Sequence, residues 1–349
     1  MARTYSALEV EPESRRAQVC ELWQANLSPR SDAQLCHKLQ SGYVDNPAGR
    51  GKIVIVYAGD AASPVGVQGI HPRRLHFGSH HIRAANLADY AVNSEHRTLG
   101  PALILLKHAI AISNASFELV YGIANRKSAA VCARAGLQKL GTVTRFAKLT
   151  SSRSRLAASM PAAAADLISP IIDCGLSLVN LVRSYVFQPR MSCRVGNFDD
   201  ASIDQVWRQR CGEMLLSERT AEMLRWRYAD PIAATWQLCA LAAHGNSVGQ
   251  VVWRLTGTVA QVGDFFCVDP ERMTASLLHA FSMHAFGLGA HSISLEFCGS
   301  AAVVAQIGRA GFRPRASEGS LFLRPGAPES LSVSDLSAWY FTHFDNDSD

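Results

Sequence analysis

The sequence predicts a mixed α/β fold that is built twice, as two similar domains joined by a linker. Apolar residues at strand spacing and at helix spacing alternate along the chain. Several short segments of the first half recur in the same order in the second half. Between the halves, residues 151–165 are rich in Ser, Arg and Ala, a composition typical of linkers. We therefore expect domains at 1–150 and 192–349, with a helical linker at 151–191.

The internal repeat depends on the order of its members, because any one of them could arise by chance. The matching pairs are Tyr43-Val-Asp-Asn-Pro with Tyr228-Ala-Asp-Pro, Val65-Gly with Val248-Gly, Asp89 to Glu95 with Asp264 to Glu271, Ser128-Ala-Ala-Val with Ser300-Ala-Ala-Val, and Arg134-Ala-Gly-Leu with Arg309-Ala-Gly-Phe. All of them keep their order along the chain, which predicts a duplicated fold.

The composition is that of a globular protein, with 48% hydrophobic and 18% charged residues among 349. The net charge of +5 suits a small anionic ligand and lacks the concentrated basic stripe expected for nucleic acid. The nine cysteines are scattered without a C-x-x-C pair, so we expect no metal site and a reducing cytoplasm. The N-terminus has no apolar signal core.

The elements of the first half follow from local patterns. We expect helices at 13–27 and 31–39, hairpin strands at 52–58 and 65–70, a strand ending at Val92, a helix at 100–113, a strand at 117–123, a helix that Gly136 ends, and a closing strand near 140–149. The stretch His71–Arg83, rich in His and Arg, predicts a basic hairpin that is solvated or faces the substrate. Residues 335–344 predict a short docked helix.

The stretch Ala88–Ala102 organises the first domain, because it runs from a strand through a polar turn into a helix. Pro101 suits the first helical turn, where its missing N–H costs nothing. Gly100 and Ala102 allow a ligand to approach the backbone, and the free N–H groups of a helix start bind anions such as phosphate. A plain strand–helix turn is the alternative, since R-x-x-G-x-A alone is a weak pattern.

With Arg97-x-x-Gly-x-Ala102 after the central strand and Asn125-x-x-Ser128 further on, the chain resembles the GNAT superfamily of acyl-CoA-dependent N-acyltransferases. The resemblance covers residues 10–149 well and 192–325 more weakly. It implies two tandem GNAT-like domains, each a mostly antiparallel mixed sheet flanked by helices. Asn46-Pro-Ala-Gly and Trp226-Arg-Tyr-Ala-Asp-Pro also resemble GNAT-type proteins associated with bacterial polysaccharide and exosortase loci.

The resemblance also implies acetyl-CoA or another acyl-CoA as co-substrate, with no metal, and it assigns residues to that ligand. The loop that would bind the pyrophosphate consists of Arg97, Thr98, Leu99, Gly100, Pro101 and Ala102. Tyr90, Ala91 and Val92 would lie along the pantetheine arm. Asn125 and Ser128 would contact its distal part and cap the next helix.

Catalysis in this family is direct attack of an amine on the thioester, followed by protonation of the thiolate. Cys132 stands where the family has a thiolate-protonating Tyr, so it is a candidate acid or a buried helix residue. Asp89 and Glu95 are candidate bases, although Asp264 and Glu271 echo them in the second copy, which would also suit a role in the fold. Tyr90 is a further candidate for a proton-relay or substrate contact.

The second copy has lost the loop, because aligning Glu271 on Glu95 places Ser276 where Gly100 should be. We therefore expect the C-terminal copy not to bind CoA. The apolar stretch 167–187 predicts an inter-domain helix or a helix on the inner membrane surface, and its Asp173 and Arg183 argue against a true span.

The expected function is transfer of an acetyl or longer acyl group to a primary amine of a small molecule, such as an amino sugar. Two alternatives remain open. One is a non-catalytic ligand-binding or assembly protein of tandem GNAT-like domains. The other is an aminoacyl-tRNA-dependent transferase of the peptidoglycan-bridging kind, which would have no need for the intact loop.

Overall fold

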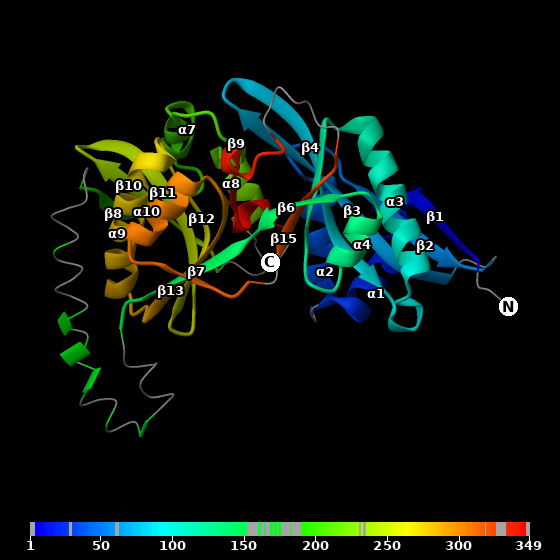
Figure 1. The fold of residues 1–349 in the computed structure, drawn as a ribbon, viewed down its shortest axis with the longest axis horizontal. Coiled ribbons are helices and arrows are strands. Elements are labelled where there is room, and N and C mark those ends of the chain that lie inside the picture. The colour runs from blue at the N-terminus through cyan, green and yellow to red at the C-terminus, as the bar shows by residue number, and fades with distance from the viewer. Residues whose placement is uncertain are drawn as a thin grey trace.

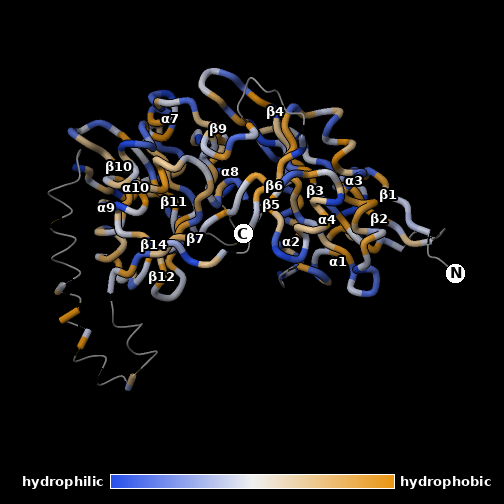
Figure 2. Tube along the Cα trace, in the orientation of Figure 1, coloured by the Kyte–Doolittle hydropathy of each residue, from blue (hydrophilic) through white to orange (hydrophobic). Residues whose placement is uncertain are grey.

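A computed structural model describes residues 4–27, 30–59, 63–151, 190–229, 235–317, 319–325 and 333–346, together with isolated positions in 160–182 and Ile232. Figure 1 shows two lobes side by side, with the red C-terminal segment between them. Apolar stretches follow the strands of both lobes (Figure 2). The helix expected at 167–187 lies largely outside the described residues.

The first lobe is built on an eight-stranded sheet, sheet A, in the order β1-β2-β3-β4-β5-β15-β6, with β9 paired to β3. Its strands are β1 Tyr5–Val10, β2 Lys52–Ala58, β3 Ser63–Phe77, β4 His80–Val92, β5 Leu119–Ala124, β15 Ser320–Leu323, β6 Gln138–Thr142 and β9 Leu215–Ser217. Its helices are α1 Arg16–Asn26, α2 Asp32–Leu39, α3 Leu99–Ser116 and α4 Ala129–Arg134, with single turns η1 Gln40–Val44 and η2 Ser94–His96. The pairing of β4 with β5 is parallel and its neighbours are antiparallel, so the sheet is mixed as expected.

The second lobe repeats this plan in sheet B, whose order is β14-β7-β13-β12-β11-β10-β8, with β16 paired to β13. Its strands are β8 Ser192–Gly196, β10 Gln237–Ala243, β11 Asn246–Thr256, β12 Val259–Cys267, β13 Ser292–Gly299, β7 Thr144–Leu149, β14 Arg313–Arg315 and β16 Tyr340–Thr342. Its helices are α7 Ala201–Arg208, α8 Ala221–Tyr228, α9 Pro270–Gly287 and α10 Ala301–Arg309, with η4 Leu336–Ala338 and η5 His343–Asp345. The duplicated α/β fold is therefore confirmed.

Sheet A takes two strands, β9 and β15, from the second half of the chain, and sheet B takes one strand, β7, from the first half. In sheet A, β15 lies between β5 and β6, and in sheet B, β7 holds the same place between β13 and β14. The predicted closing strand near 140–149 is thus two strands, β6 in sheet A and β7 in sheet B. The domain limits drawn from composition stay a prediction, and the two sheets share strands across them.

Local sequence explains where several helices begin and end. The side chains of Ser31 and Gln34 form a capping box at the start of α2. Gly136, with φ of 98°, follows the last turn of α4 and ends it, since a left-handed residue suits glycine. Helix α3 is long and apolar enough to cross a membrane, but it packs across β1 to β5, as a core helix does.

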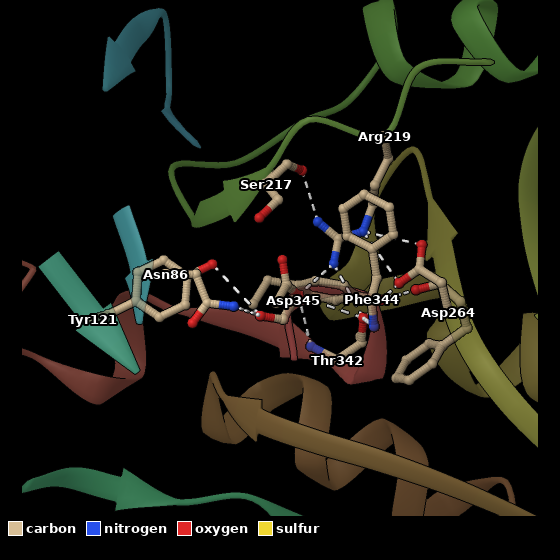
Figure 3. Close-up of polar contacts among 10 residues, drawn as sticks. Asn86, Tyr121, Ser217, Arg219, Asp264, Thr342, Phe344 and Asp345 are labelled. Carbon is tan, nitrogen blue, oxygen red and sulfur yellow. Dashed lines mark hydrogen bonds and ion pairs between the residues drawn. The ribbon is translucent and has the colours of Figure 1, made fainter. Parts of the chain in front are cut away.

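The C-terminal segment joins the two lobes through buried polar contacts (Figure 3). The Asp345 side chain accepts a bond from Arg219 at 2.9 Å, and its backbone oxygen accepts bonds from Asn86 at 3.4 Å and Tyr121 at 3.5 Å. Arg219 also pairs with Asp264 at 3.1 Å. The tail expected as a helix is docked, but it forms the strand β16 and two short turns, because its Tyr340–Thr342 backbone pairs with β13.

The basic hairpin at 71–83 exists, but the prediction that it is solvated is wrong for its first strand. His71, Arg73 and His76 are buried, while His80 and His81 at the turn are exposed. At the end of β3, β9 of the second half pairs with Leu75–Phe77 and covers the strand, whereas His71 packs against Tyr43 and Asp89 of the first lobe. Arg73 lies 4.9 Å from the ring of Trp226, another residue of the second half.

Candidate functional site

The site is organised by the divergence of β4 from β5. The two strands pair from Ala84 to Leu87 on β4, and β4 then continues to Val92 with no partner on that side among the described residues. On that side, the backbone from Ala88 to Val92 therefore offers an extended ligand the polar groups that no other contact uses, while the carbonyls of Ala88 and Val92 already accept from Gln68 and Arg97. The predicted contacts Tyr90, Ala91 and Val92 all lie on this edge, although their role toward a ligand stays a prediction.

A β-bulge shapes the same edge. Asp89 and Tyr90 on β4 stand opposite the single residue Gln68 on β3, where the pairing register shifts. Asp89 adopts φ of 54°, a left-handed conformation that is uncommon outside glycine and is best tolerated by Asp and Asn. The Gln68 amide donates to the carbonyl of Ala88 at 2.6 Å and to that of Gly69 at 2.9 Å. The bulge is therefore held by side-chain hydrogen bonds, and strained backbone of this kind clusters at functional sites.

A pocket lies at the point where the strands separate, with about 370 Å³ of empty space that is partly open to solvent. It is lined by Gln68, Leu87, Tyr90, Leu106, Gly122, Ile123, Ser128, Val131, Cys132 and Leu137. The structure thus brings together Tyr90, Ser128 and Cys132, which come from β4, the loop after β5, and α4. The remaining lining is mostly apolar.

The phenol of Tyr90 and the thiol of Cys132 are the two side-chain groups of this pocket that carry an acidic proton. Burial, with a contribution from Cys132, raises the pKa of the Tyr90 phenol to about 12. Burial also raises the pKa of the Cys132 thiol to about 11. Both groups are therefore protonated at neutral pH, and either is able to donate a proton to a strong base formed beside it.

The start of α3 has the features expected of an anion site. Thr98 is the N-cap residue, but its side chain makes no capping hydrogen bond, so the first N–H groups remain available. Thr98, Leu99 and Gly100 are exposed, whereas Pro101 and Ala102 are buried in the first turn. A Cβ on Gly100 would meet no atom within 4 Å, so the space in front of this backbone is open.

The guanidinium group of Arg97 is directed toward Val92 and Asn26, away from the open space in front of Gly100. Its Nε donates to the carbonyl of Val92 at 2.9 Å, and its Nη2 donates to the side chain of Asn26 at 3.0 Å. Asn26 in turn donates to Asn93 at 2.6 Å. The arrangement makes Arg97 an anchor that fixes the loop against the end of β4 and α1.

The carboxylate of Asp89 is engaged in contacts with other side chains of the first lobe. It contacts Nζ of Lys38 at 2.8 Å, accepts a hydrogen bond from Tyr43 at 2.7 Å and lies 3.5 Å from Nε2 of His71. Burial alone would raise its pKa, but Lys38 and His71 outweigh that effect and hold the pKa well below its usual range. Burial lowers the pKa of His71. Such a carboxylate is a weak base, so the geometry supports a role in the fold, and the predicted role in proton removal stays a prediction.

The second lobe supports this interpretation of Asp89. Val92 pairs with Gly66 and Cys267 pairs with Gly249, so the strand registers make Asp89 and Asp264 equivalent. Asp264 is also buried against a cation, Arg219. A buried carboxylate at the equivalent strand position of both lobes, inside the bulge in sheet A and beside the register shift in sheet B, indicates a shared structural requirement.

Two other predicted residues, Glu95 and Asn125, do not line the pocket. Glu95 is exposed on the η2 turn and forms no ion pair with any described residue. Its predicted role as a base therefore stays a prediction. Asn125 accepts N–H bonds from Lys127 at 2.9 Å and Ser128 at 3.0 Å through its side chain. It forms the turn that starts α4 and thereby places Ser128 in the pocket.

The second lobe differs where the anion site should be. Only Val268 and Asp269 separate β12 from α9, and the Asp269 side chain caps the helix by accepting from the N–H of Arg272 at 3.2 Å. By their positions in the helices, Gly100 corresponds to Glu271, so the alignment of Glu271 on Glu95 and of Ser276 on Gly100 is wrong. The Glu271 side chain accepts a bond from Ser300 at 2.6 Å. This helix start already carries carboxylates, which repel a phosphate.

Comparison with known proteins shows the fold. No family model matches the chain, and no curated protein matches its sequence. Solved structures match it over most of its length. One is a probable N-acyltransferase of unknown function from Enterococcus faecalis, with a TM-score of 0.61 at 10% sequence identity, covering 92% of this chain and 72% of that one. Another is a GCN5-related N-acetyltransferase from Anabaena variabilis, with a TM-score of 0.60 at 11% sequence identity, covering 93% of this chain and 72% of that one. The chain has the GNAT fold.

An N-myristoyltransferase from Saccharomyces cerevisiae, solved with bound myristoyl-CoA and inhibitors, also shares this GNAT fold. Its TM-score is 0.55 at 10% identity, with 93% of this chain and 79% of that one covered. At sequence identities this low, the similarity shows that the chain shares the fold, and it does not show that the chain shares substrates or catalytic residues with these proteins.

Several residues of the GNAT-fold site were missed from the sequence. Gln68 was missed because its contact with the bulge depends on strand register, and Asn26 because a helix end gives no sign of which loop it will hold. Lys38 was missed because its partner lies on a distant strand. The Tyr43-Val-Asp-Asn-Pro repeat did contain a signal, since Tyr43 is a partner of Asp89.

Proposed function

We propose that the chain is an acyl-CoA-dependent N-acyltransferase whose first lobe binds the acyl donor. The observation that carries the proposal is the continuous path from the uncapped start of α3, along the unpaired edge Ala88–Val92, to the pocket that holds Tyr90 and Cys132. One end of the path suits a pyrophosphate, the middle suits the amides of pantetheine, and the mostly apolar pocket suits the thioester end.

The residues of the path divide the work of binding. N–H groups of the first turn of α3, near Gly100, would hold the phosphates, and Arg97 keeps that turn in place through Val92 and Asn26. An acyl-CoA supplies an activated thioester, which a neutral amine attacks directly. A strand N–H near the bulge would stabilise the developing oxyanion.

Tyr90 is the group we propose as proton donor to the departing thiolate, with Cys132 packed beside it. The phenol stands in the pocket on β4, and its raised pKa keeps it protonated throughout the physiological range. Positioned acids commonly contribute about 10²- to 10⁴-fold, and a thiolate leaving group needs the smaller end of that range.

Tyr90→Phe should therefore lower kcat by about 100-fold with little change in the KM for acyl-CoA. The matched variant is Cys132→Ala, which removes the other protonated group of the pocket and should stay within about 2-fold of the wild type. Steady-state rates from chromatography of free CoA avoid interference from the protein's own thiols. A loss of kcat in Cys132→Ala but not in Tyr90→Phe would assign the proton to Cys132.

The acceptor is proposed to be a primary amine on a small molecule. Amino sugars come first in the test, because of the resemblance of two segments to proteins of polysaccharide loci. The decisive assay incubates the protein with acetyl-CoA and longer acyl-CoAs against a panel of amines and identifies the product by mass spectrometry. Absence of both acyl-CoA binding and product would refute the proposal.

A binding protein without transferase activity is the second candidate. It is favoured by the occupied carboxylate of Asp89 and by Cys132 at the position of the family's Tyr. Calorimetry separates the two candidates, because tight acyl-CoA binding without turnover on any amine supports the binding protein. The tRNA-dependent alternative would instead show tRNA binding that weakens steeply with salt.

A further inference from the structure

Three potential ligand side chains meet in the second lobe, far from the proposed acyl-CoA site. Cys193 is on β8, Cys239 is on β10, and His284 is in the last turn of α9. One ligand atom from each lies within 4.8 Å of the other two. They form the only group of this kind among the described residues, and from here on we call it the Cys2His cluster.

The sheet and helix geometry explains why the cluster forms. In the pairing of β8 with β10, Cys193 stands opposite Leu241, two residues along the same face from Cys239. Both thiols therefore point to one face of sheet B. Helix α9 packs on that face against β8 and β10, which brings His284 to the same place.

The surroundings leave the cluster's polar atoms poorly satisfied. Cys239 is fully buried, and the buried Nε2 of His284 has no hydrogen-bond partner among the described residues. The ring of the buried Trp253 lies 6.3 Å from the His284 ring. The thiols of Cys193 and Cys239 hydrogen bond to each other, and Cys239 also contacts the side chain of Trp253. A buried imidazole nitrogen without a partner calls for a ligand.

We propose that the Cys2His cluster binds one zinc ion, which fastens the edge strand β8 to α9. Two thiolates and an imidazole are ligands that Zn²⁺ prefers, at about 2.3 Å for sulfur and about 2.0 Å for nitrogen, in a tetrahedral site. Binding releases the two thiol protons, and the resulting complex of Zn²⁺ with two thiolates and a neutral histidine carries no net charge. A neutral complex suits an apolar site. Cys193 and His284 are only partly buried, so water can complete the fourth position.

The proposal departs from the expectation of no metal, which rested on the absence of a C-x-x-C pair. Because the three ligands lie on three separate elements, they form no short sequence motif by which the site could be recognised. The inference is independent of the proposed acyltransferase function.

Cobalt provides the direct test, because thiolate ligation of Co²⁺ gives a charge-transfer band in the near ultraviolet and tetrahedral geometry gives strong bands in the red. The full chain, freed of metal under reducing conditions, should develop both sets of bands with one equivalent of Co²⁺ and lose them when Zn²⁺ is added. His284→Ala and Cys193→Ser should bind Co²⁺ at least about 10-fold more weakly.

The matched control is Cys20→Ser. Cys20 also hydrogen bonds to a second thiol, Cys36, but no third ligand joins that pair in the described part of the chain. This variant should keep the full spectrum. Since a ligand variant could simply unfold, the melting temperature with and without chelator is measured in parallel, and chelator should lower it in the wild type but not in His284→Ala.

Any of three results would overturn the proposal. One is a missing charge-transfer band at one equivalent of Co²⁺, and another is the same band in folded His284→Ala. The third is a Cys193–Cys239 disulfide in protein purified without reductant that persists when zinc is supplied during expression, which would assign the pair to redox chemistry instead.

Discussion

Gly100→Glu should abolish the stabilisation of the protein by acyl-CoA. The substitution places a carboxylate in front of the free N–H groups of α3, where it both fills the space and repels phosphate. We expect at least about 100-fold weaker binding, which corresponds to about 2.7 kcal/mol. At a ligand concentration about 100-fold above the wild-type Kd, ligand stabilisation falls from about 2.7 kcal/mol to about 0.4 kcal/mol or less. Thermal melts with and without acetyl-CoA and longer acyl-CoAs measure it.

Two variants control this experiment. Gly100→Ala adds a Cβ that meets no protein atom within 4 Å, so it should fold normally and weaken binding less than the glutamate does. Gly287→Glu makes the same change at another open glycine, at the end of α9 in the second lobe, and should leave binding intact. If acyl-CoA still stabilises Gly100→Glu as strongly as the wild type, the anion site is not at α3.

Asp89→Asn should cost about 3–5 kcal/mol of unfolding free energy, because it removes the negative charge that lies 2.8 Å from the largely buried ammonium of Lys38. Asn tolerates the left-handed backbone at this position, so the variant tests charge and not backbone conformation. Denaturant unfolding of wild type and variant measures the difference. The exposed Glu95→Gln is the control and should stay within about 0.5 kcal/mol.

The pH dependence of this difference has a defined sign. The pKa of Asp89 is lowered in the folded protein and lies near 3.9 in an unfolded chain. Its stabilisation is therefore present above about pH 4 and is lost as the pH falls through the acid range. The gap between wild type and Asp89→Asn should narrow on acidification. Unchanged stability at pH 7 together with a lost kcat would instead identify Asp89 as the base.

Much of the fold could be predicted from the sequence, because hydrophobic period and turn residues act locally. The strand that ends at Val92, the helix that Gly136 ends and the order of the repeat all depend on neighbours within a few positions. The path from Gly100 to Tyr90 was accessible for the same reason, since strand, turn and helix are contiguous in the chain.

The remaining features depend on contacts between distant segments. The pattern of residues 144–149 specifies a strand but not which sheet it joins. The buried environment of Asp89 comes from Lys38 and His71, on two other elements, and β9 of the second half buries the end of the first strand of the basic hairpin. The capping role of Asp269 could not be seen from the sequence, because the alignment of Glu271 on Glu95 placed the start of α9 too far along the chain.

The exchange of β7 and β15 makes the two halves interlocked. A single cut of the backbone between residues 151 and 190 would yield two polypeptides, each carrying a strand that sits between two strands of the other's sheet. Dissociation would then require both sheets to open, so the nicked protein should remain one particle until it unfolds. The two lobes are therefore joined by their hydrogen-bonded sheets as well as by the segment that connects them, and a change that loosens β15 in one lobe weakens the attachment of both.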